Sequence, residues 1–423
     1  MRISKNKQII VNILTWLYFF LSYIITFLTS ERSRLGGYLL IGIVFFVLMY
    51  YIITNFNTIR VRITYYHVYI FIFGLYCMIS SNWAIRPNWA RNKGIDILEI
   101  LVAMSVFYLN YQERRTIDGF LKVIMYGCYA VVLYSFVFYG WRTMLSMLSD
   151  ASRISNDAVN ANVLGMCASY AVVINLYYVL SDRKVRIWDI LVIPSIAVLA
   201  VSGSRKALVV CVAGVFGVFI LKNWNGKKAL KSFLKVSLVI IVLTALVFTV
   251  SRLPAFRGIN ARMMELITIL FKNNYTRSNS AWIRMEYNKL GMRLFRSSPV
   301  LGIGIGSANY YTKRMYGHDH FLHNNYIEML ACGGIVGFII YYSVYLVILG
   351  RLFRYRRFRD REYDICLILL LIVMVMDYGK VSYLEKNTYV FLMLFWAETE
   401  ILKRRARGDF RLQELVSFKT CKS

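Results

Sequence analysis

The sequence lacks the cysteine spacing of a disulfide framework and of a cysteine metal site. Its seven cysteines are scattered along the chain, and six of them fall in apolar runs. No pair shows the short, repeated spacing that zinc sites use. We therefore expect the cysteines to pack as small apolar side chains.

Acidic residues are also scarce. The chain has 22 Asp and Glu against 51 Lys and Arg, which gives a formal net charge of +29. Such an excess would suit a nucleic-acid partner. Here, however, the cations gather at the ends of apolar runs, where membrane proteins carry them. Nucleic-acid binding is therefore not expected.

Apolar runs of membrane-spanning length recur along the chain, 58% of which is hydrophobic. A helix needs about 20 residues to cross the hydrocarbon core, and about twelve runs meet or approach that length. The first run has no small-residue cleavage pattern, so we expect it to be retained. The sequence thus predicts an all-α, polytopic membrane protein. The expected spans lie near 9–29, 35–54, 63–81, 94–110, 117–140, 159–181, 187–203, 204–222, 232–250, 326–350, 363–379 and 386–402.

Basic residues indicate the orientation of these spans. If the N-terminus is cytoplasmic, alternate gaps carry most of the cations, as the positive-inside rule requires. This predicts nine spans within residues 1–250 and one long extracytoplasmic loop at 251–325. Three further spans within 326–402 and a basic cytoplasmic tail at 403–423 would follow.

The predicted outer loop is itself basic, with eleven Lys and Arg against three Asp and Glu. Phosphate carried on a lipid or sugar is one natural counter-charge. Anionic lipid headgroups are another, and charge alone leaves both open. Within the loop, 281–296 shows helical spacing, with an apolar stripe at Ile283, Tyr287, Leu290 and Leu294. An interfacial helix could rest such a stripe on lipid.

Glycines and histidines follow this helix. No lysine follows Gly302, Gly304 and Gly306 as in a P-loop, and no strand–helix context indicates a dinucleotide site. A tight backbone path is the simpler interpretation. Three of the four histidines come next, at positions 318, 320 and 323. They could bind zinc, one could act as a general base, or they could serve only as hydrogen-bonding groups. Asn324 could cap the helix that follows.

Two polar insertions interrupt the earlier spans. Ser204 and Arg205 separate two apolar runs on the predicted outer side, where an arginine must reach the interface or meet an anion. Arg153, Asn160 and Asn162 precede another span. Asparagine side chains can hold sugar hydroxyls, but they are equally ordinary helix caps.

In their order over residues 150–350, these features resemble the O-antigen ligase and polymerase superfamily of bacterial envelope polysaccharide enzymes. The resemblance rests on Arg153, Asn160, Asn162, Ser204, Arg205, Arg284, Pro299, Leu301, Gly302, Gly304, Gly306, His323, Asn324 and Gly333-Gly334-Ile335-Val336-Gly337. It implies a helical bundle of the GT-C type in the bacterial inner membrane. The implied donor is a glycan on undecaprenyl diphosphate, and no metal or other cofactor is implied.

The same resemblance places Arg205, Arg284 and His323 in the catalytic site. The residues it suggests for substrate binding are Arg153, Asn160, Asn162, Arg293, Gly304, Gly306 and Asn324. Arginines suit the charge that grows on a diphosphate leaving group. A neutral histidine suits proton transfer from the attacking sugar hydroxyl.

Three functions stay open at this point. A polymerase, the function we expect, would join lipid-linked repeat units, and a ligase would move the glycan to a terminal acceptor. A flippase without chemistry would be expected to place cations along a path through the bilayer interior, whereas here they gather at one face. Membrane lipid, a chain-length regulator and a separate flippase are the expected partners.

Overall fold

The computed structural model of this chain describes residues 5–25, 30–55, 63–112, 114–149, 161–223, 234 and 280–408. Within these ranges the chain is helical and has no β-strand, which confirms the all-α prediction for them. The predicted span at 232–250, apart from residue 234, lies outside the described residues. So do the part of the outer loop before residue 280 and the tail after residue 408.

The chain divides into two compact units, and each is described by itself. The first unit contains Met1–Gln8, Val44–Asp118 and Thr276–Ser423, and the second contains Ile9–Ile43 and Gly119–Tyr275. The long helices α1 (Lys5–Ile25), α2 (Ser30–Asn55) and α5 (Arg114–Tyr139) each contribute residues to both.

The second unit contains α6 (Trp141–Ser149), α7 (Ala161–Asp182), η3 (Ile187–Leu191), α8 (Val192–Ser202) and α9 (Arg205–Asn223). Gly203 takes a left-handed conformation (φ 55°), which ends α8 and lets α9 begin two residues later. The Ser169 hydroxyl on α7 donates to the Ala207 carbonyl on α9 at 2.7 Å. The two predicted spans at 187–203 and 204–222 therefore both pack on α7.

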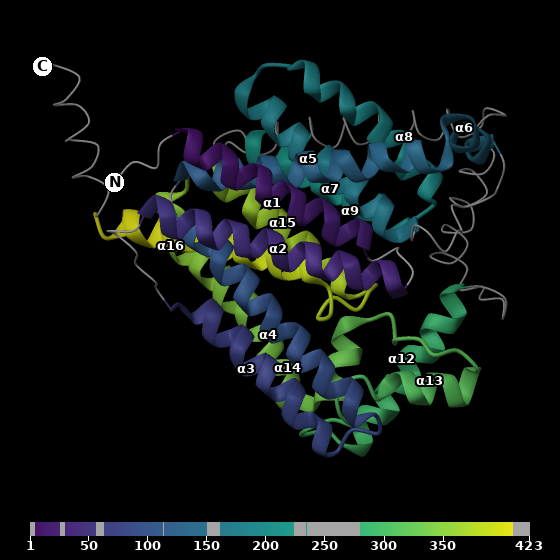
Figure 1. Cartoon of the computed structure of the whole chain (residues 1–423). Helices are drawn as coiled ribbons and strands as arrows, with labels where there is room; N and C mark the ends of the chain where they lie inside the picture. The colour runs from purple at the N-terminus through teal and green to yellow at the C-terminus, as the bar shows by residue number, and fades with distance from the viewer. Residues whose placement is uncertain are drawn as a thin grey trace, which may run out of the picture. The chain divides into compact units, whose positions relative to one another are not determined.

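The first unit is built around α3 (Tyr65–Ile79), α4 (Pro87–Asn110) and α14 (Asn325–Arg354), which run side by side (Figure 1). Gly74 and Gly94 allow α3 and α4 to approach closely, because a Cβ on Gly94 would lie 2.8 Å from the Gly74 carbonyl oxygen. The remaining elements of the unit are η2 (Ser80–Asn82), α12 (Ser280–Ser297), α13 (Ala308–Tyr316), η6 (Arg356–Phe358), α15 (Arg361–Asp377) and α16 (Lys386–Ala406).

Helix α14 is broken at Gly334, whose backbone is not helical (φ 61°, ψ −166°). The rings of Tyr326 and Tyr342 stack with centroids 4.8 Å apart, although sixteen residues of straight helix would separate them by about 24 Å. The segment before Gly334 therefore folds back on the segment after it. The span predicted near 326–350 is present as a candidate, but it is interrupted at Gly334, and the part 335–354 runs without a break over about 30 Å.

Contacts within the first unit join segments that the predicted topology assigns to the same side. At one end Arg86 pairs with Asp319, and the Ser382 N–H donates to the Asn325 side chain. At the other end the Arg404 guanidinium donates to the Gln112 carbonyl. Which end faces the outside stays a prediction.

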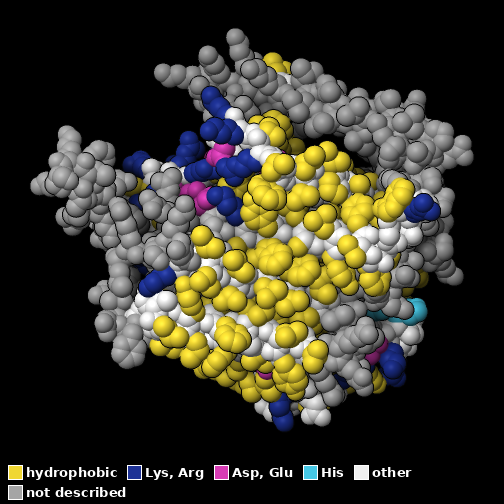
Figure 2. Space-filling view, turned by 45° about the horizontal axis from the view of Figure 1, so that its top comes forward, with side chains coloured by type: hydrophobic (Ala, Val, Ile, Leu, Met, Phe, Trp, Pro, Cys, Tyr) yellow, Lys and Arg dark blue, Asp and Glu magenta, His cyan; other side chains and the backbone are white. Residues whose placement is uncertain are grey.

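The hydrophobic surface supports a membrane location. Five helices of the described residues are long and apolar enough to cross a membrane. One of them is α14, taken over its full length across the break at Gly334. The face in Figure 2 is dominated by hydrophobic side chains, and α2 exposes Tyr38, Phe46 and Ile53. Such surface is stable in lipid but not in water. The expected number of about twelve spans is not confirmed.

Cysteine labelling tests the predicted sidedness. Lys313 on α13 and Arg407 after α16 are both exposed, and we expect them on opposite faces of the membrane. A membrane-impermeant maleimide should modify Lys313→Cys in intact cells, but Arg407→Cys only after permeabilisation. The background chain carries Cys421→Ser and retains six buried native cysteines. Labelling of Arg407→Cys but not Lys313→Cys in intact cells would reverse the orientation.

Candidate active site

Helix α12 confirms the helix predicted at 281–296 and shows what its apolar stripe contacts. Tyr287, Leu290 and Leu294 are buried. The adjacent Gly291 admits α14, since a Cβ there would lie 2.3 Å from the Ile327 side chain. The stripe therefore packs on protein, and the alternative in which it rests on lipid is wrong for these residues.

A glycine turn follows α12 and fits into the break in α14. Gly302, Gly304 and Gly306 all have positive φ angles, of 68°, 92° and 74°. The N–H groups of Ile303 and Gly304 donate to the Ala331 and Cys332 carbonyls, both at 3.0 Å. In return, the N–H groups of Ile335 and Val336 donate to the carbonyls of Pro299 and Val300, at 2.8 and 3.1 Å. Backbone groups left free by the helix break are thus paired with the turn.

The glycines also permit close contacts with the α3–α4 connection. A Cβ on Gly304 would lie 2.4–2.5 Å from Cβ and Cα of Ala84, and one on Gly306 would lie 2.0 Å from the Trp89 ring. Packing and left-handed backbone therefore account for glycine at both positions. Their predicted role in substrate binding stays a prediction.

The histidine segment 318–324 is held between α4 and α13. The Arg86 guanidinium donates to both carboxylate oxygens of Asp319, at 3.2 and 2.9 Å. These hydrogen bonds from Arg86 lower the pKa of Asp319 below its usual value. The Thr312 hydroxyl on α13 donates to the His320 carbonyl at 2.7 Å, so the segment is attached at two points.

The neighbours of His323 hold its backbone in place. Leu322 donates its N–H to Glu328 Oε2 at 2.8 Å, and the Asn324 side chain caps α14 by accepting the Ile327 N–H at 3.3 Å. This confirms the predicted cap. His323 itself has a positive φ of 57°, which is uncommon for a residue other than glycine and is often found at functional sites.

The His323 ring takes part in a row of aromatic contacts. It stacks on Tyr287 with centroids 6.0 Å apart and an interplanar angle of 19°. The His320 ring is a second neighbour of the His323 ring, with centroids 6.1 Å apart. Tyr316 forms a T-shaped contact with Tyr287, with centroids 5.3 Å apart. Burial raises the pKa of Tyr287 and of Tyr316 above the usual range, so both phenols stay neutral.

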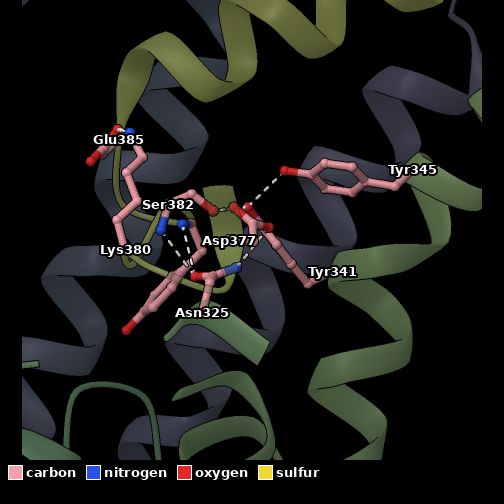
Figure 3. Close-up of polar contacts among 8 residues, drawn as sticks. Asn325, Tyr341, Tyr345, Asp377, Lys380, Ser382 and Glu385 are labelled. Atoms are coloured by element: carbon pink, nitrogen blue, oxygen red, sulfur yellow. Dashed lines mark hydrogen bonds and ion pairs between the residues drawn. The ribbon is translucent and has the colours of Figure 1, made fainter. Parts of the chain in front are cut away.

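A buried polar network surrounds Asn325, two residues after His323, and Figure 3 shows the contacts of Asn325 with Asp377 and Ser382. The Asn325 amide donates to Tyr342 at 2.8 Å and to Asp377 at 3.3 Å, and its oxygen accepts the Ser382 N–H at 3.0 Å. Tyr342 also donates to Asp377, at 3.0 Å. The network ties the start of α14 to its second half and to the α15–α16 connection. It therefore anchors the helix that begins beside His323.

The predicted site residues are divided between the two units. In the first unit Arg284 is partly buried one turn before Tyr287, and Arg293 is exposed further along α12. In the second unit the Ser204 hydroxyl donates to Asn162 at 3.1 Å, directly before Arg205 begins α9. Two predicted segments, those of Asn162 and Arg205, thus come together.

Arg153 and Asn160, two of the residues predicted to bind substrate, lie outside the described residues. In the ranges that are described, no three His, Cys, Asp or Glu side chains form a group placed to hold a metal ion. That observation leaves the expected metal independence a prediction.

Sequence reasoning missed several contributors to the site. Glu328 was detectable, because it is the one charged residue of the run 326–350 and a carboxylate inside an apolar run needs a partner. Asp377 was detectable for the same reason, near the end of the run 363–379, whereas Arg86 and Tyr287 gave no such signal. Their partners lie dozens or hundreds of residues away in the chain.

Comparison with known proteins identifies one domain. Residues 190–342 match the family described as O-antigen ligase. The matched range contains Arg205, Arg284, Arg293, Gly304, Gly306, His323 and Asn324. None of the curated proteins matches the chain. The family match confirms the resemblance to the O-antigen ligase and polymerase superfamily.

Paired glycine substitutions test the packing of the turn. Gly317 and Gly304 both have positive φ, but a Cβ on Gly317 meets nothing within 4 Å. Gly317→Ala should cost about 1–2 kcal/mol for the left-handed backbone alone. Gly304→Ala should cost about 1–3 kcal/mol more, because it also overpacks Ala84. Thermal unfolding in detergent measures both, and equal melting temperatures would contradict the packing role.

Proposed function

We propose that this chain, which carries an O-antigen ligase family domain at residues 190–342, is a multi-pass membrane glycosyltransferase that polymerises lipid-linked oligosaccharide repeat units. The donor would be a glycan on undecaprenyl diphosphate, handled at the outer face of the bacterial inner membrane. The observation that carries the proposal is the packing of α12, with Arg284, against the His323 segment inside the matched domain.

The reaction would be one displacement at the anomeric carbon of the donor. The acceptor hydroxyl oxygen forms the new bond to that carbon while the bond to the diphosphate oxygen breaks. The electron pair of the broken bond leaves with undecaprenyl diphosphate. The hydroxyl proton passes to the neutral His323 imidazole and later to water. Attack opposite the leaving group inverts the anomeric configuration.

Arginine supplies the charge that this displacement needs. Negative charge grows on the diphosphate oxygens as the bond breaks, and a guanidinium binds two such oxygens at once. Arg284 on α12 would meet the diphosphate in this way, and the family resemblance implies the same role for Arg205, which begins α9. Because arginine stays charged, the clamp requires no divalent metal.

The ligase is the alternative within the same family, because it would use the same donor and the same displacement. It differs only in the acceptor, which would be a terminal molecule and not another repeat unit. A flippase would need no base and no leaving-group clamp. The chain-length regulator and the separate flippase expected as partners belong to the polymerase proposal.

Substitution of Arg284 tests the anion clamp. Arg284→Ala should lower glycan transfer by roughly 10²–10³-fold, because it removes a contact that strengthens as charge develops. Arg284→Lys should recover part of the loss, since lysine lacks the two-pronged donor. Arg296→Ala, exposed in the last turn of the same helix, is the control. Product lengths measured on gels should be normal for Arg296→Ala, and normal products from Arg284→Ala would remove Arg284 from the site.

Substitution of His323 tests the base. His323→Ala should lower transfer by roughly 10²–10⁴-fold, the usual contribution of general-base catalysis. In the wild-type protein the rate should fall as the pH drops, because the protonated imidazole cannot accept a proton. His318→Ala, an exposed residue of the same segment, is the control and should be milder. An unchanged acid limb in His323→Ala, with near-normal turnover, would leave only structural roles for this histidine.

A further inference from the structure

Tyr287 has a place in the site that the sequence did not indicate. It is 1% exposed, and its hydroxyl has no hydrogen-bond partner among the described residues. A buried tyrosine normally finds a partner for its hydroxyl. What keeps this side chain at its position is therefore its ring, which contacts both His323 and Tyr316.

The geometry of the ring contact suits a positive charge on His323. The two rings are nearly parallel, at 19°, and their centroids lie 6.0 Å apart. The face of a tyrosine ring is electron-rich, and it attracts a cation placed within about 6 Å of its centroid. Tyr316 also packs against the Tyr287 ring, in a T-shaped contact with an interplanar angle of 62°.

We propose that Tyr287 is a positioning residue that orients the His323 imidazole and stabilises the imidazolium formed when His323 accepts the acceptor's proton. The inference rests on the proposed function, because it assigns the charged form of His323 a role in the reaction. Tyr287 needs no hydroxyl for this task. Its raised pKa keeps the phenol neutral, so the attraction comes from the ring face and not from a phenolate.

Other titratable groups also lie near His323. The His320 ring lies near the His323 ring, with centroids 6.1 Å apart. Glu328 on α14 is bonded to the adjacent Leu322 N–H, and Arg284 lies one turn before Tyr287 on α12. All of these groups are retained when only the ring at position 287 is changed.

A graded series at position 287 measures the ring effect directly. Phenylalanine and phenylalanines of increasing fluorination keep the shape of the side chain while they weaken the negative face of the ring. Histidine labelled with ¹³C gives four signals, because the chain has four histidines, and the signal lost in His323→Gln identifies His323. A pH titration in bilayer nanodiscs then gives its protonation equilibrium.

The expected result is a graded fall in the pKa of His323. Tyr287→Phe should leave it unchanged, and the most fluorinated ring should shift the protonation equilibrium by about threefold, the size of a partly exposed cation–π contact. Weaker stabilisation of the charged form lowers the pKa, so the acid limb of the transfer rate should move to lower pH by the same amount. Tyr310→Leu, on α13, is the control for a general loss of aromatic packing. A second series in a His320→Asn background removes the neighbouring imidazole and should show the same slope.

The outcomes separate the inference from the proposed function. A pKa of His323 that does not respond to fluorination would overturn the stacking role, even if activity fell. A graded pKa with an acid limb that does not follow would retain the stacking and overturn the base role of His323. If the pKa of His323 and the acid limb of the transfer rate move together, the result supports both the stacking role of Tyr287 and the base role of His323.

Discussion

The break in α14 is the constraint on which the rest of the site depends. A helix that stops inside an apolar run leaves N–H and C=O groups unpaired, and each costs several kcal/mol where water is absent, by general estimates of about 2–7 kcal/mol. Here the segment Pro299–Gly304 supplies the missing partners through four backbone hydrogen bonds. The turn and the helix break therefore have to form together. Together they bring α12, which precedes the turn, next to the histidine segment 318–324, which precedes α14.

The position of His323 depends more on these backbone hydrogen bonds and on buried contacts than on ion pairs. The Arg86–Asp319 pair is bidentate but partly exposed, with side chains 28% and 41% accessible. Exposed pairs contribute about 0–1 kcal/mol. The helix cap by Asn324, the bond from Leu322 to buried Glu328, and the packing of Gly291 on Ile327 are shielded from water. These contacts, and not the surface charge, hold the histidine beside α12.

What could be predicted from the sequence were the features that depend on near neighbours in the chain. The stripe of Tyr287, Leu290 and Leu294 has the period of a helix, so α12 was predictable, and Asn324 stands where a cap belongs. The fold-back of α14 was not, because glycines inside an apolar run are also tolerated in straight transmembrane helices. The Tyr287–His323 stack joins residues from separate elements. Periodicity carries no information about such pairs.

In the first unit, the segment that carries His323 is thus packed against α12, the helix that carries Arg284. This arrangement suits a reaction in which charge appears on a leaving diphosphate and on the base at once, since preorganised partners need not rearrange as that charge develops.

The most direct measurement is the fate of a lipid-linked repeat unit in vesicles that contain the purified protein. Undecaprenyl-diphosphate oligosaccharide, labelled in the sugar and supplied on the face that carries α13, should give longer glycans whose new linkages are inverted at the anomeric carbon. One undecaprenyl diphosphate should be released for each new bond. If the labelled lipid instead crosses the bilayer intact, with no new glycosidic bond and no free undecaprenyl diphosphate, the protein is a transporter and the account of its site is wrong.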